Sequence, residues 1–439
     1  MASEDYTEKN RKRLIAFFES GAKRASDLGN LGVEVEHFVV ANDGTPISYE
    51  PTDANVGIRD VLDHLSAWYP HKTFNSRHDL LGLLGEDGSI TLEPAAQLEL
   101  SAAPFRRIDE VEGAYERFRN RVDSFLEARG ARIRTGGYHP TRRAQEMTLI
   151  PKERYAYMDS YFARIGTHGD RMMRASASTQ VSVDYVNEAD AVRKMRVAAA
   201  LAPILAAICD NTRTYEGKDN NMPIRRLTLW REVDGLRCGT IPHIFEEGFG
   251  FGAYADWLLG VPPIFVTRPA SDDPHGARIR PFFVQPAAEA YADAPMDDAD
   301  VEHLISMFWP DVRLKRFVEI RPADCVPQEQ VLGYTALIKG VFYSEESLSA
   351  VEEELGVDAQ TRATHGAWGI TNEDVTNAIA QIQERGLSAE VYGKHILSWE
   401  RQLFSLAYRA LPPNERDYLA PLESFAADKP WWKSERGNS

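Results

Sequence analysis

The amino-acid sequence predicts an α+β protein whose strands form an antiparallel sheet. Segments with the period-two alternation of strands are mixed with segments of helical spacing, without the regular strand-helix-strand order of a doubly wound fold. The sequence contains no internal repeat and no low-complexity tract. With 439 residues, 43% of them hydrophobic and 26% charged, the chain can bury a substantial core and has the composition of a globular protein.

The first 130 residues contain three segments with helical spacing and two with strand alternation. Helical spacing lies at 5–20, 58–69 and 106–130, and the last of these ends at Gly130. Strand alternation lies at 32–40 (GVEVEHFVV) and, after the turn residues GEDGS, at 90–101 (ITLEPAAQLELS). We therefore expect a strand near each end of this region, with helices between and beyond them.

From residue 179 onward the sequence predicts a strand, a long helix, an irregular region and a helical C-terminal part. TQVSVDY (179–185) alternates like a strand, and Asn187 is a suitable N-cap for the helix that follows. Residues 214–300 are expected to form mainly loops, with 268–298 as the best candidate for a mobile loop. VRLKRFVEIRP (312–322) predicts a strand, and 344–411 is helical, with Ser344 and Thr371 or Asn372 as caps.

Charge and cysteine content argue against several classes of function. A net charge of −16 without a local basic patch repels nucleic acid and anionic membranes. The longest apolar stretch, 197–209, is shorter than the roughly 20 residues that cross a bilayer, and the N-terminus MASEDYTEKNRKR is unlike a signal peptide. We expect no nucleic-acid or membrane partner and a cytoplasmic location. Cys209, Cys238 and Cys325 are scattered, so they suggest neither a disulfide framework nor a thiolate metal site.

Four predicted strands carry a polar pair at positions i and i+2, which places both members on one face. One interpretation is an amphipathic sheet whose polar face lies in water. The other is a binding site, because water-exposed strand faces usually carry Thr and Lys, whereas the first three pairs contribute only carboxylates, amides and a hydroxyl. Like charges on neighbouring strands repel, and a divalent cation reverses the sign of that interaction. The pairs are Glu34 with Glu36, Gln97 with Glu99, Gln180 with Ser182, and Glu319 with Arg321.

The segment TLEPAAQLELSAAP (91–104) is the most unusual of these, because Glu93 and Glu99 have no basic neighbour before Arg106. Mg²⁺ prefers carboxylate oxygens and leaves other positions to water and substrate phosphates. Mg²⁺ and a nucleotide would therefore explain both acids. No P-loop pattern is present, and GFGFG (248–252) follows no clean strand and opens no clean helix, so we expect a flexible or tightly turned loop there.

Basic residues that could offset phosphate charge form two groups, and solvation at the surface explains most of them. Arg321 is the exception, because it shares a strand face with Glu319, and a guanidinium beside a metal-binding carboxylate can hold a transferring phosphoryl group. His37 and His168 lack the spacing of paired metal ligands, so we do not expect them to be catalytic. The two basic groups are Arg225, Arg226 and Arg231, and Arg313, Lys315, Arg316 and Arg321.

Six segments in a fixed order resemble the glutamate-cysteine ligases of plants and many bacteria. The resemblance covers about residues 30–325 and implies a glutamine synthetase-like fold, in which a curved antiparallel sheet forms a funnel-shaped active site with helices packed outside. We expect a catalytic domain over 1–385 and a packed helical extension over 386–439. The segments are GVEVEHF, EDGSITLEPAAQLELSAAP, IPKERYAYMDSYFARIGTHGDRMM, TQVSVDY, TLWREVDGLRCG and DVRLKRFVEIRPAD.

The resemblance implies that ATP activates L-glutamate as a γ-glutamyl phosphate, which the amino group of L-cysteine attacks. Catalysis is expected to depend on Glu99 and on Arg321, which would contact the transferring phosphate. Arg231 would hold the glutamate substrate, and Lys315 with Arg321 would bind the nucleotide. The expected Mg²⁺ ligands, carried over by position, are Glu34, Glu36, Glu93, Glu99 and Glu319, with Gln180 near the metals.

Two departures from the family pattern leave the amine substrate open. Similar proteins commonly have Gly-Gly where this chain has Ala95 and Ala96, and Asn where it has Ser182. Methyl groups at 95 and 96 would narrow the space beside the nucleotide or substrate. The expected partners are the small molecules glutamate, cysteine and ATP, and we expect a monomer or homodimer. The alternatives are a ligase for a different amine and a catalytically silent binding module.

Overall fold

The computed structural model describes residues 5–166, 168–270, 273–281, 283–364, 366–429 and 432. In this part of the chain nine strands form one sheet, and every pair of neighbours is antiparallel, as the sequence predicts. β6 (Ala131–Arg134) pairs with the second half of β1. The other eight strands follow the order β14 (Val312–Leu314), β15 (Val318–Ile320), β7 (Thr179–Val183), β1 (Leu31–Ala41), β5 (Leu98–Ala102), β4 (Gly88–Leu92), β3 (Leu80–Gly85) and β2 (His71–Phe74).

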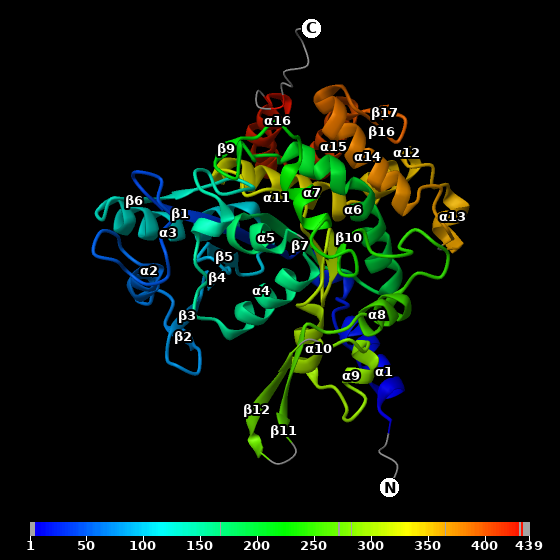
Figure 1. Ribbon diagram of the computed structural model, residues 1–439. Coiled ribbons are helices and arrows are strands. Elements are labelled where there is room, and N and C mark those ends of the chain that lie inside the picture. Colours follow the sequence, from blue (N-terminus) through cyan, green and yellow to red (C-terminus); the bar gives the residue numbers. More distant parts are fainter. Residues whose placement is uncertain are drawn as a thin grey trace.

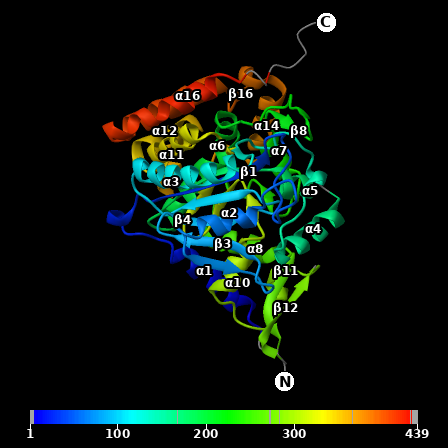
Figure 2. The same ribbon diagram turned by 90° about the vertical axis from the view of Figure 1, so that its left-hand side faces the viewer.

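Helices pack on the apolar face of the sheet, which carries side chains such as Val33, Val35 and Val181. On this face His37 of β1 meets Tyr115 and Phe118 of α3 (Ile108–Glu127). α11 (Gln328–Phe342) contacts β1 and β7, α6 (Glu188–Ile208) contacts β14 and β15, and α2 (Ile58–Leu65) contacts β3. Figure 2 shows α3, α11 and α16 (Leu419–Ala427) as successive layers above the sheet. The buried side chains on this side of the sheet belong to the main hydrophobic cluster of the protein.

Three short helices face the other side of the sheet, near β5 and β7. They are α4 (Glu153–Ile165), α5 (Gly169–Ala175) and α7 (Arg225–Arg231). Figure 1 shows α4 and α5 beside these strands, with the β11–β12 hairpin projecting below them. The polar pairs of the sequence lie on the sheet face that these helices cover.

Two segments that the sequence predicts as single strands are hairpins. Residues 90–101 form β4 and β5, joined by a turn at 93–97 in which the Glu93 carbonyl accepts a hydrogen bond from the Ala96 amide. Ala96 has φ 67°, a left-handed conformation that costs a residue with Cβ about 1 kcal/mol and glycine nothing. A relative with glycine at this position therefore differs first in backbone strain. Likewise 312–322 folds into β14 and β15.

Residues 214–300 contain more regular structure than the sequence predicts. α8 (Phe251–Gly260) begins directly after Gly250, so GFGFG does open a helix, and the Phe251 amide at its start donates to Glu188. β11 (Phe265–Ala270) and β12 (Asp273–Pro281) form an antiparallel hairpin within the segment expected to be a mobile loop. Residues 271, 272 and 282 of that segment lie outside the described residues. The remaining elements here are β8 (Thr214–Tyr215), β9 (Lys218–Asp219), β10 (Cys238–Gly239), α9 (Ala287–Ala290), α10 (Asp298–Ile305) and β13 (Trp309–Pro310).

The predicted helix caps at Asn187, Ser344 and Thr371 are confirmed. The side chains of Asn187, Ser344 and Thr371 each accept a hydrogen bond from a backbone amide at the start of α6, α12 (Glu345–Glu354) and α14 (Asn372–Arg385). α1 (Thr7–Glu19) occupies the first predicted helix. The other C-terminal elements are α13 (Ala359–Thr364), β16 (Glu390–Val391), β17 (Lys394–His395) and α15 (Ile396–Ala410).

A buried lysine anchors the C-terminal segment. α15 and α16 pack against α11 and α6, and the Nζ of Lys429 donates to the carbonyls of Ile208 and Asp210, both at 3.0 Å. The Trp432 indole donates to the Asp210 carboxylate, which also accepts from the Ile224 amide at the start of α7. The C-terminal segment therefore supports a helix on the polar side of the sheet. The predicted domain boundary at residue 385 stays a prediction. Among the described helices, none has both the length and the apolar composition needed to cross a membrane.

Candidate active site

The strand register brings the predicted carboxylates together on one face of the sheet. Glu36 of β1 lies directly opposite Glu99 of β5, and Glu34 lies opposite Gln180 of β7. Glu319 of β15 lies opposite Ser182 of β7. Because Glu36 and Glu99 are each 8% exposed and Glu319 is fully buried, the interpretation of a polar face lying in water is wrong for these residues.

A cavity of about 200 Å³ lies between this face and the short helices. Its sheet side is acidic, and its opposite side combines three apolar methionines and two tryptophans with the basic side chains of Lys152 and Arg154. Four of the predicted metal ligands line it. The lining residues from the sheet and its turns are Glu34, Glu36, Glu93, Pro94, Gln97, Glu99, Gln180, Arg313 and Arg321, and those facing them are Lys152, Arg154, Tyr155, Met158, Met172, Met173, Ser176, Trp230, Ser306 and Trp309.

The carboxyl groups of the cavity resist ionisation in the protein alone. Burial, together with the charges of Glu36 and Glu99, raises the pKa of Glu93 to about 8. Burial and the charges of Glu319 and Glu99 raise the pKa of Glu34 to about 7. Neither Glu34 nor Glu93 has a side-chain hydrogen bond or ion pair within the described residues. Bringing all of these carboxylates to full ionisation therefore requires additional positive charge in the cavity.

Glu36 and Glu99 are held in place by neutral donors. Glu36 accepts hydrogen bonds from the Ser178 amide (2.7 Å), the Ser178 hydroxyl (2.8 Å) and Gln180 Nε2 (3.0 Å). Glu99 accepts from the hydroxyls of Thr91 (2.5 Å) and Ser101 (2.9 Å). Burial still raises the pKa of both carboxyl groups, against these hydrogen bonds and, for Glu36, against the charge of Arg226. Fixed carboxylates of this kind are preorganised to bind a cation.

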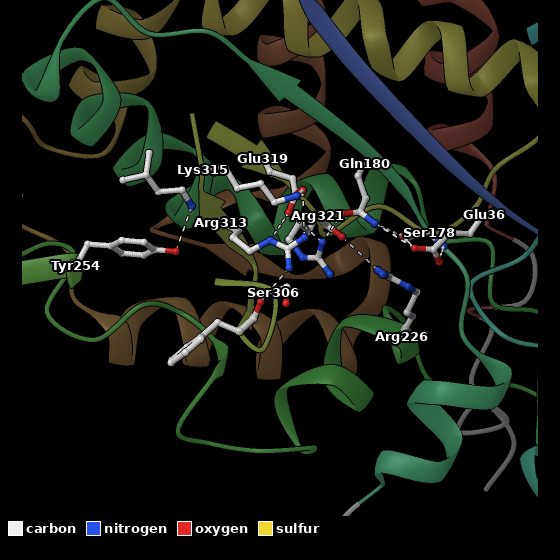
Figure 3. Close-up of polar contacts among 12 residues, drawn as sticks. Glu36, Ser178, Gln180, Arg226, Tyr254, Ser306, Arg313, Lys315, Glu319 and Arg321 are labelled. Atoms are coloured by element: carbon white, nitrogen blue, oxygen red, sulfur yellow. Dashed lines mark hydrogen bonds and ion pairs between the residues drawn. The ribbon is translucent and has the colours of Figure 1, made fainter. Parts of the chain in front are cut away.

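Glu319 is different, because three basic residues surround it (Figure 3). Its oxygens contact Arg313 Nε (2.7 Å), Lys315 Nζ (2.7 Å) and Arg321 (3.0 Å). Burial acts to raise the pKa of Glu319, but the charges of Arg313, Lys315 and Arg321 outweigh it and hold the pKa well below its usual range. A metal at Glu319 would have to displace at least one of these cations. Its role as a metal ligand stays a prediction.

Arg321 connects the basic cluster to the carboxylates. It lines the cavity, donates to Gln180 Oε1 and Glu319, and lies 5.7 Å from the ring centroid of Trp230. Figure 3 shows the resulting row of contacts from Arg313 through Glu319, Arg321 and Gln180 to Glu36. A guanidinium at this place can meet a phosphoryl group that approaches the carboxylates.

Two predicted binding residues lie outside the cavity lining. Arg231 is next to Trp230 in the chain, but its guanidinium binds Asp311 and Thr240. Lys315 is occupied with Glu319. Neither placement brings the side chain into the cavity, so the substrate and nucleotide contacts assigned to them stay predictions.

Lys152 and Arg154 were not singled out by sequence reasoning, although the segment IPKERYAYM that contains them was. Lys152 precedes α4 and Arg154 lies in its first turn, where Arg154 donates to the hydroxyl and carbonyl oxygens of Ser306. Lys152 makes no ion pair within the described residues, and burial lowers its pKa. The sequence signal for them is a pair of basic residues at positions i and i+2, Lys152 and Arg154, in a segment whose other residues suit the buried start of a helix.

The donor set fits Mg²⁺ at the acidic side of the cavity. Glu34, Glu36, Glu93 and Glu99 offer carboxylate oxygens, the ligands that Mg²⁺ prefers, and the raised pKa values of Glu34 and Glu93 indicate unbalanced negative charge. In the described residues no three acidic, histidine or cysteine side chains are already close enough to hold an ion. Side-chain rotation or a bound phosphate would have to complete the coordination. His37 is buried against α3, and His168 pairs with Glu232 at the surface, so neither contributes.

Comparison with known proteins gives a consistent result. The model of glutamate-cysteine ligase family 2 matches residues 30–425. The chain is 32% identical over 345 residues to glutamate-cysteine ligase B, chloroplastic, of Oryza sativa subsp. japonica, covering 78% of this chain and 68% of that protein. It is 32% identical over 343 residues to the chloroplastic glutamate-cysteine ligase of Arabidopsis thaliana, covering 78% and 64%. The fold resembles the crystal structure of the glutamate-cysteine ligase of Francisella tularensis in complex with AMP, with a TM-score of 0.50 and 12% identity over 92% of this chain and 82% of that one.

Proposed function

The chain belongs to glutamate-cysteine ligase family 2, and on that premise we propose that it joins the γ-carboxylate of L-glutamate to the amino group of L-cysteine, giving γ-glutamylcysteine. The observation that carries the proposal is the cavity itself. It sets four carboxylates against Lys152, Arg154 and Arg321 in one enclosed space. These charges can meet a metal-associated phosphoryl group and a substrate carboxylate next to each other.

We propose ATP and Mg²⁺ as the nucleotide and the metal. The AMP in the Francisella tularensis ligase supports a nucleotide for this chain as well. Glu36, Glu93 and Glu99, with Glu34, would hold Mg²⁺, which supplies the positive charge that these carboxylates lack and neutralises phosphate oxygens. The funnel shape and the glutamine synthetase-like architecture expected from the sequence remain part of this proposal.

The reaction has two steps. A γ-carboxylate oxygen of glutamate attacks the γ-phosphorus of ATP and ADP leaves, and the free amine of cysteine then attacks the acyl carbon of γ-glutamyl phosphate and inorganic phosphate leaves. Phosphoryl transfer asks the protein mainly for positioning and charge neutralisation. Arg321, Lys152 and Arg154 line the cavity and would neutralise the transferring phosphoryl group or the carboxylates of glutamate. The predicted glutamate contact of Arg231 would require it to leave Asp311.

A panel of amines tests the proposal. Purified protein with ATP, Mg²⁺ and glutamate should release ADP faster when L-cysteine is added than when L-alanine, L-2-aminobutyrate, L-serine or glycine is added. A faster reaction with one of the other amines would instead favour a ligase for that amine. This second function is supported by Ser182, which is 7% exposed on the carboxylate face at a position where the sequence departs from the pattern expected of the family.

A catalytically silent binding module is the remaining alternative. If the protein is such a module, adding it should not raise the rate of ADP release above that of the protein-free mixture with any amine. Calorimetry would then show whether it still binds the nucleotide. The cytoplasmic location and the monomeric or homodimeric state also stay proposals. Cell fractionation and light scattering test them, and the plant relatives are chloroplastic by name.

A further inference from the structure

Lys429 and Trp432, near the C-terminal end of the described chain, bind the turn that follows α6. The Nζ of Lys429 donates to the carbonyls of Ile208 and Asp210, and the Trp432 indole donates to the Asp210 carboxylate. Lys429 is 3% exposed, Trp432 is 8% exposed and Asp210 is fully buried. Polar groups are buried without a large loss of stability only when they have partners, as they do here. We call Lys429, Trp432 and Asp210 the C-terminal clasp.

The clasp compensates a carboxylate in a place where water cannot. Burial raises the pKa of Asp210, whereas the charge of Lys429 and hydrogen bonds, among them that of Trp432, act to lower it. The ammonium of Lys429 also lies at the carbonyl end of α6, where the helix dipole favours a cation. Loss of either partner therefore leaves the Asp210 carboxylate less well stabilised.

Asp210 also holds the start of α7. The carboxylate oxygen that accepts from Trp432 accepts from the Ile224 amide as well, at 3.0 Å, and Ile224 is the N-cap residue of α7. Ile224 has φ 48°, a left-handed conformation that is unfavourable for a β-branched residue, and its side chain cannot cap the helix. The backbone at the start of α7 therefore depends on the hydrogen bond to Asp210.

α7 carries two side chains that lie against the substrate cavity. Trp230 lines the cavity, and the guanidinium of Arg321 lies 5.7 Å from its ring centroid. Arg226 donates to the carbonyls of Arg321 (3.3 Å) and Ala323 (3.4 Å), as Figure 3 shows for Arg321, and its charge opposes the burial that raises the pKa of Glu36. A displacement at the start of α7 would move both side chains relative to the carboxylates.

The turn after α6 is joined to the carboxylates by a second set of contacts. The side chain of Asp324 accepts hydrogen bonds from the Asn211 amide (2.9 Å) and the Thr212 hydroxyl (2.7 Å). Asp324 also forms a β-bridge with Ser178, whose amide and hydroxyl hold Glu36. The turn that the clasp fixes is therefore in contact with the supports of both sides of the cavity.

We propose that Lys429 and Trp432 are positioning residues of the active site, which act through Asp210 and α7 on the geometry of the substrate cavity. This inference rests on the proposed function for its effect on catalysis. When α7 is held less firmly, only a fraction of the molecules has the cavity that binds substrate, and the apparent affinity falls by that fraction. Bound substrate restores the arrangement, so KM rises while kcat stays nearly unchanged. A partly unfolded preparation would instead show a lower kcat and an unchanged KM.

Trp432→Phe tests the proposal, because it removes the indole donor and keeps an aromatic ring. The matched control is Trp399→Phe in α15, since Trp399 is fully buried and its indole donates to the Val391 carbonyl at 2.8 Å. Each variant loses one buried indole hydrogen bond in the C-terminal part of the chain, but only Trp432→Phe loses a bond to Asp210. The measurements on the full-length proteins are hydrogen exchange of the α7 amides by mass spectrometry, KM and kcat for glutamate, and thermal melting.

In Trp432→Phe we expect the α7 amides to exchange about threefold faster or more, and KM for glutamate to rise about threefold or more with kcat within about twofold of wild type. Trp399→Phe should leave α7 exchange and KM at their wild-type values, whatever its melting temperature. Unchanged α7 exchange in Trp432→Phe, faster exchange without a rise in KM, equal changes in both variants, or a fall in kcat at unchanged KM would each overturn the proposal. If the wild type joins glutamate to no amine, the proposed function fails, and the exchange comparison alone decides whether the clasp holds α7.

Discussion

Replacing Glu93 with Gln should make the metal-free protein more stable. Glu93 lies in the β4–β5 turn without a hydrogen bond to its carboxylate, and burial beside Glu36 and Glu99 raises its pKa to about 8 from the ordinary 4.5. Between these two pH values the group is protonated in the folded protein and ionised in the unfolded chain. The free energy of unfolding therefore falls as pH rises from about 4.5 to about 8, and the loss is complete above pH 8.

The size of this stability change follows from the rise in the pKa of Glu93. At pH 7, about 2.5 pH units above the ordinary pKa of 4.5, the Glu93 carboxyl group is ionised in the unfolded chain but still protonated in the folded protein. At about 1.36 kcal/mol per pH unit, this difference gives an upper bound of about 3 kcal/mol on the stability that wild type loses. Glu93 is not fully buried, so water lowers the realised value. We expect Glu93→Gln to gain about 1 to 3 kcal/mol in EDTA at pH 7. The glutamine removes the charge and keeps the shape.

Urea unfolding from pH 5 to pH 8.5 in EDTA measures this gain, with Glu86→Gln as the control. Glu86 is exposed in the turn between β3 and β4, so its replacement should change stability by less than about 0.5 kcal/mol. The wild type should lose stability with rising pH more steeply than Glu93→Gln, and Mg²⁺ should reduce the difference between them. Wild-type stability that is level from pH 5 to 8, or a Glu93→Gln protein no more stable than Glu86→Gln, would refute the reasoning.

Three further substitutions test other parts of the site. Glu99→Gln should lower the rate of ADP release by about 100-fold or more while the metal-free melting temperature stays level or rises slightly, and a variant unfolded without metal would point to a structural role instead. Lys152→Met should lower kcat/KM for glutamate or ATP by about 100-fold, with partial recovery in Lys152→Arg, and unchanged kinetics would remove Lys152 from the site. Lys429→Met should lower the free energy of unfolding by about 3 kcal/mol, because it leaves the buried Asp210 without its cation, and a loss below about 0.5 kcal/mol would contradict that role.

The sequence predicts the faces of the strands well, because side-chain direction alternates locally. Glu34 and Glu36 share the face expected for them, and the caps Asn187 and Ser344 are confirmed. Register is not local, however. That Glu36 faces Glu99 depends on how β1 pairs with β5, two strands far apart in the chain, whereas the turn at 93–97, with Ala96 at φ 67°, sets only the register of β4 against β5. The sequence therefore predicts which acids share a face but not which acids meet.

The basic side of the cavity was harder to predict. Arg231 lies in a segment with recognisable residues, yet the structure pairs it with Asp311. Lys152 and Arg154 reach the cavity because the start of α4 packs against the connection of β4 to β5, where the Tyr155 hydroxyl donates to the Leu92 carbonyl, and such packing leaves no periodic signal in the sequence. Likewise, the ion pair of Glu319 with Arg313 forms because β14 and β15 fold into a hairpin, which the sequence did not predict.

The order of strands in the sheet has a consequence for the protein during its synthesis. β1 pairs Leu31 with Val183 of β7, and the same Val183 then pairs with Val318 of β15. At 5 to 20 residues per second, a ribosome needs roughly 7 to 30 seconds to make each of these intervals. Over that time the emerging chain holds the acids of β1 and β5 but not yet Arg313 of β14 or Arg321, which follows β15. The edge of β7 that binds β15 therefore stays unpaired until the last part of the sheet has been made.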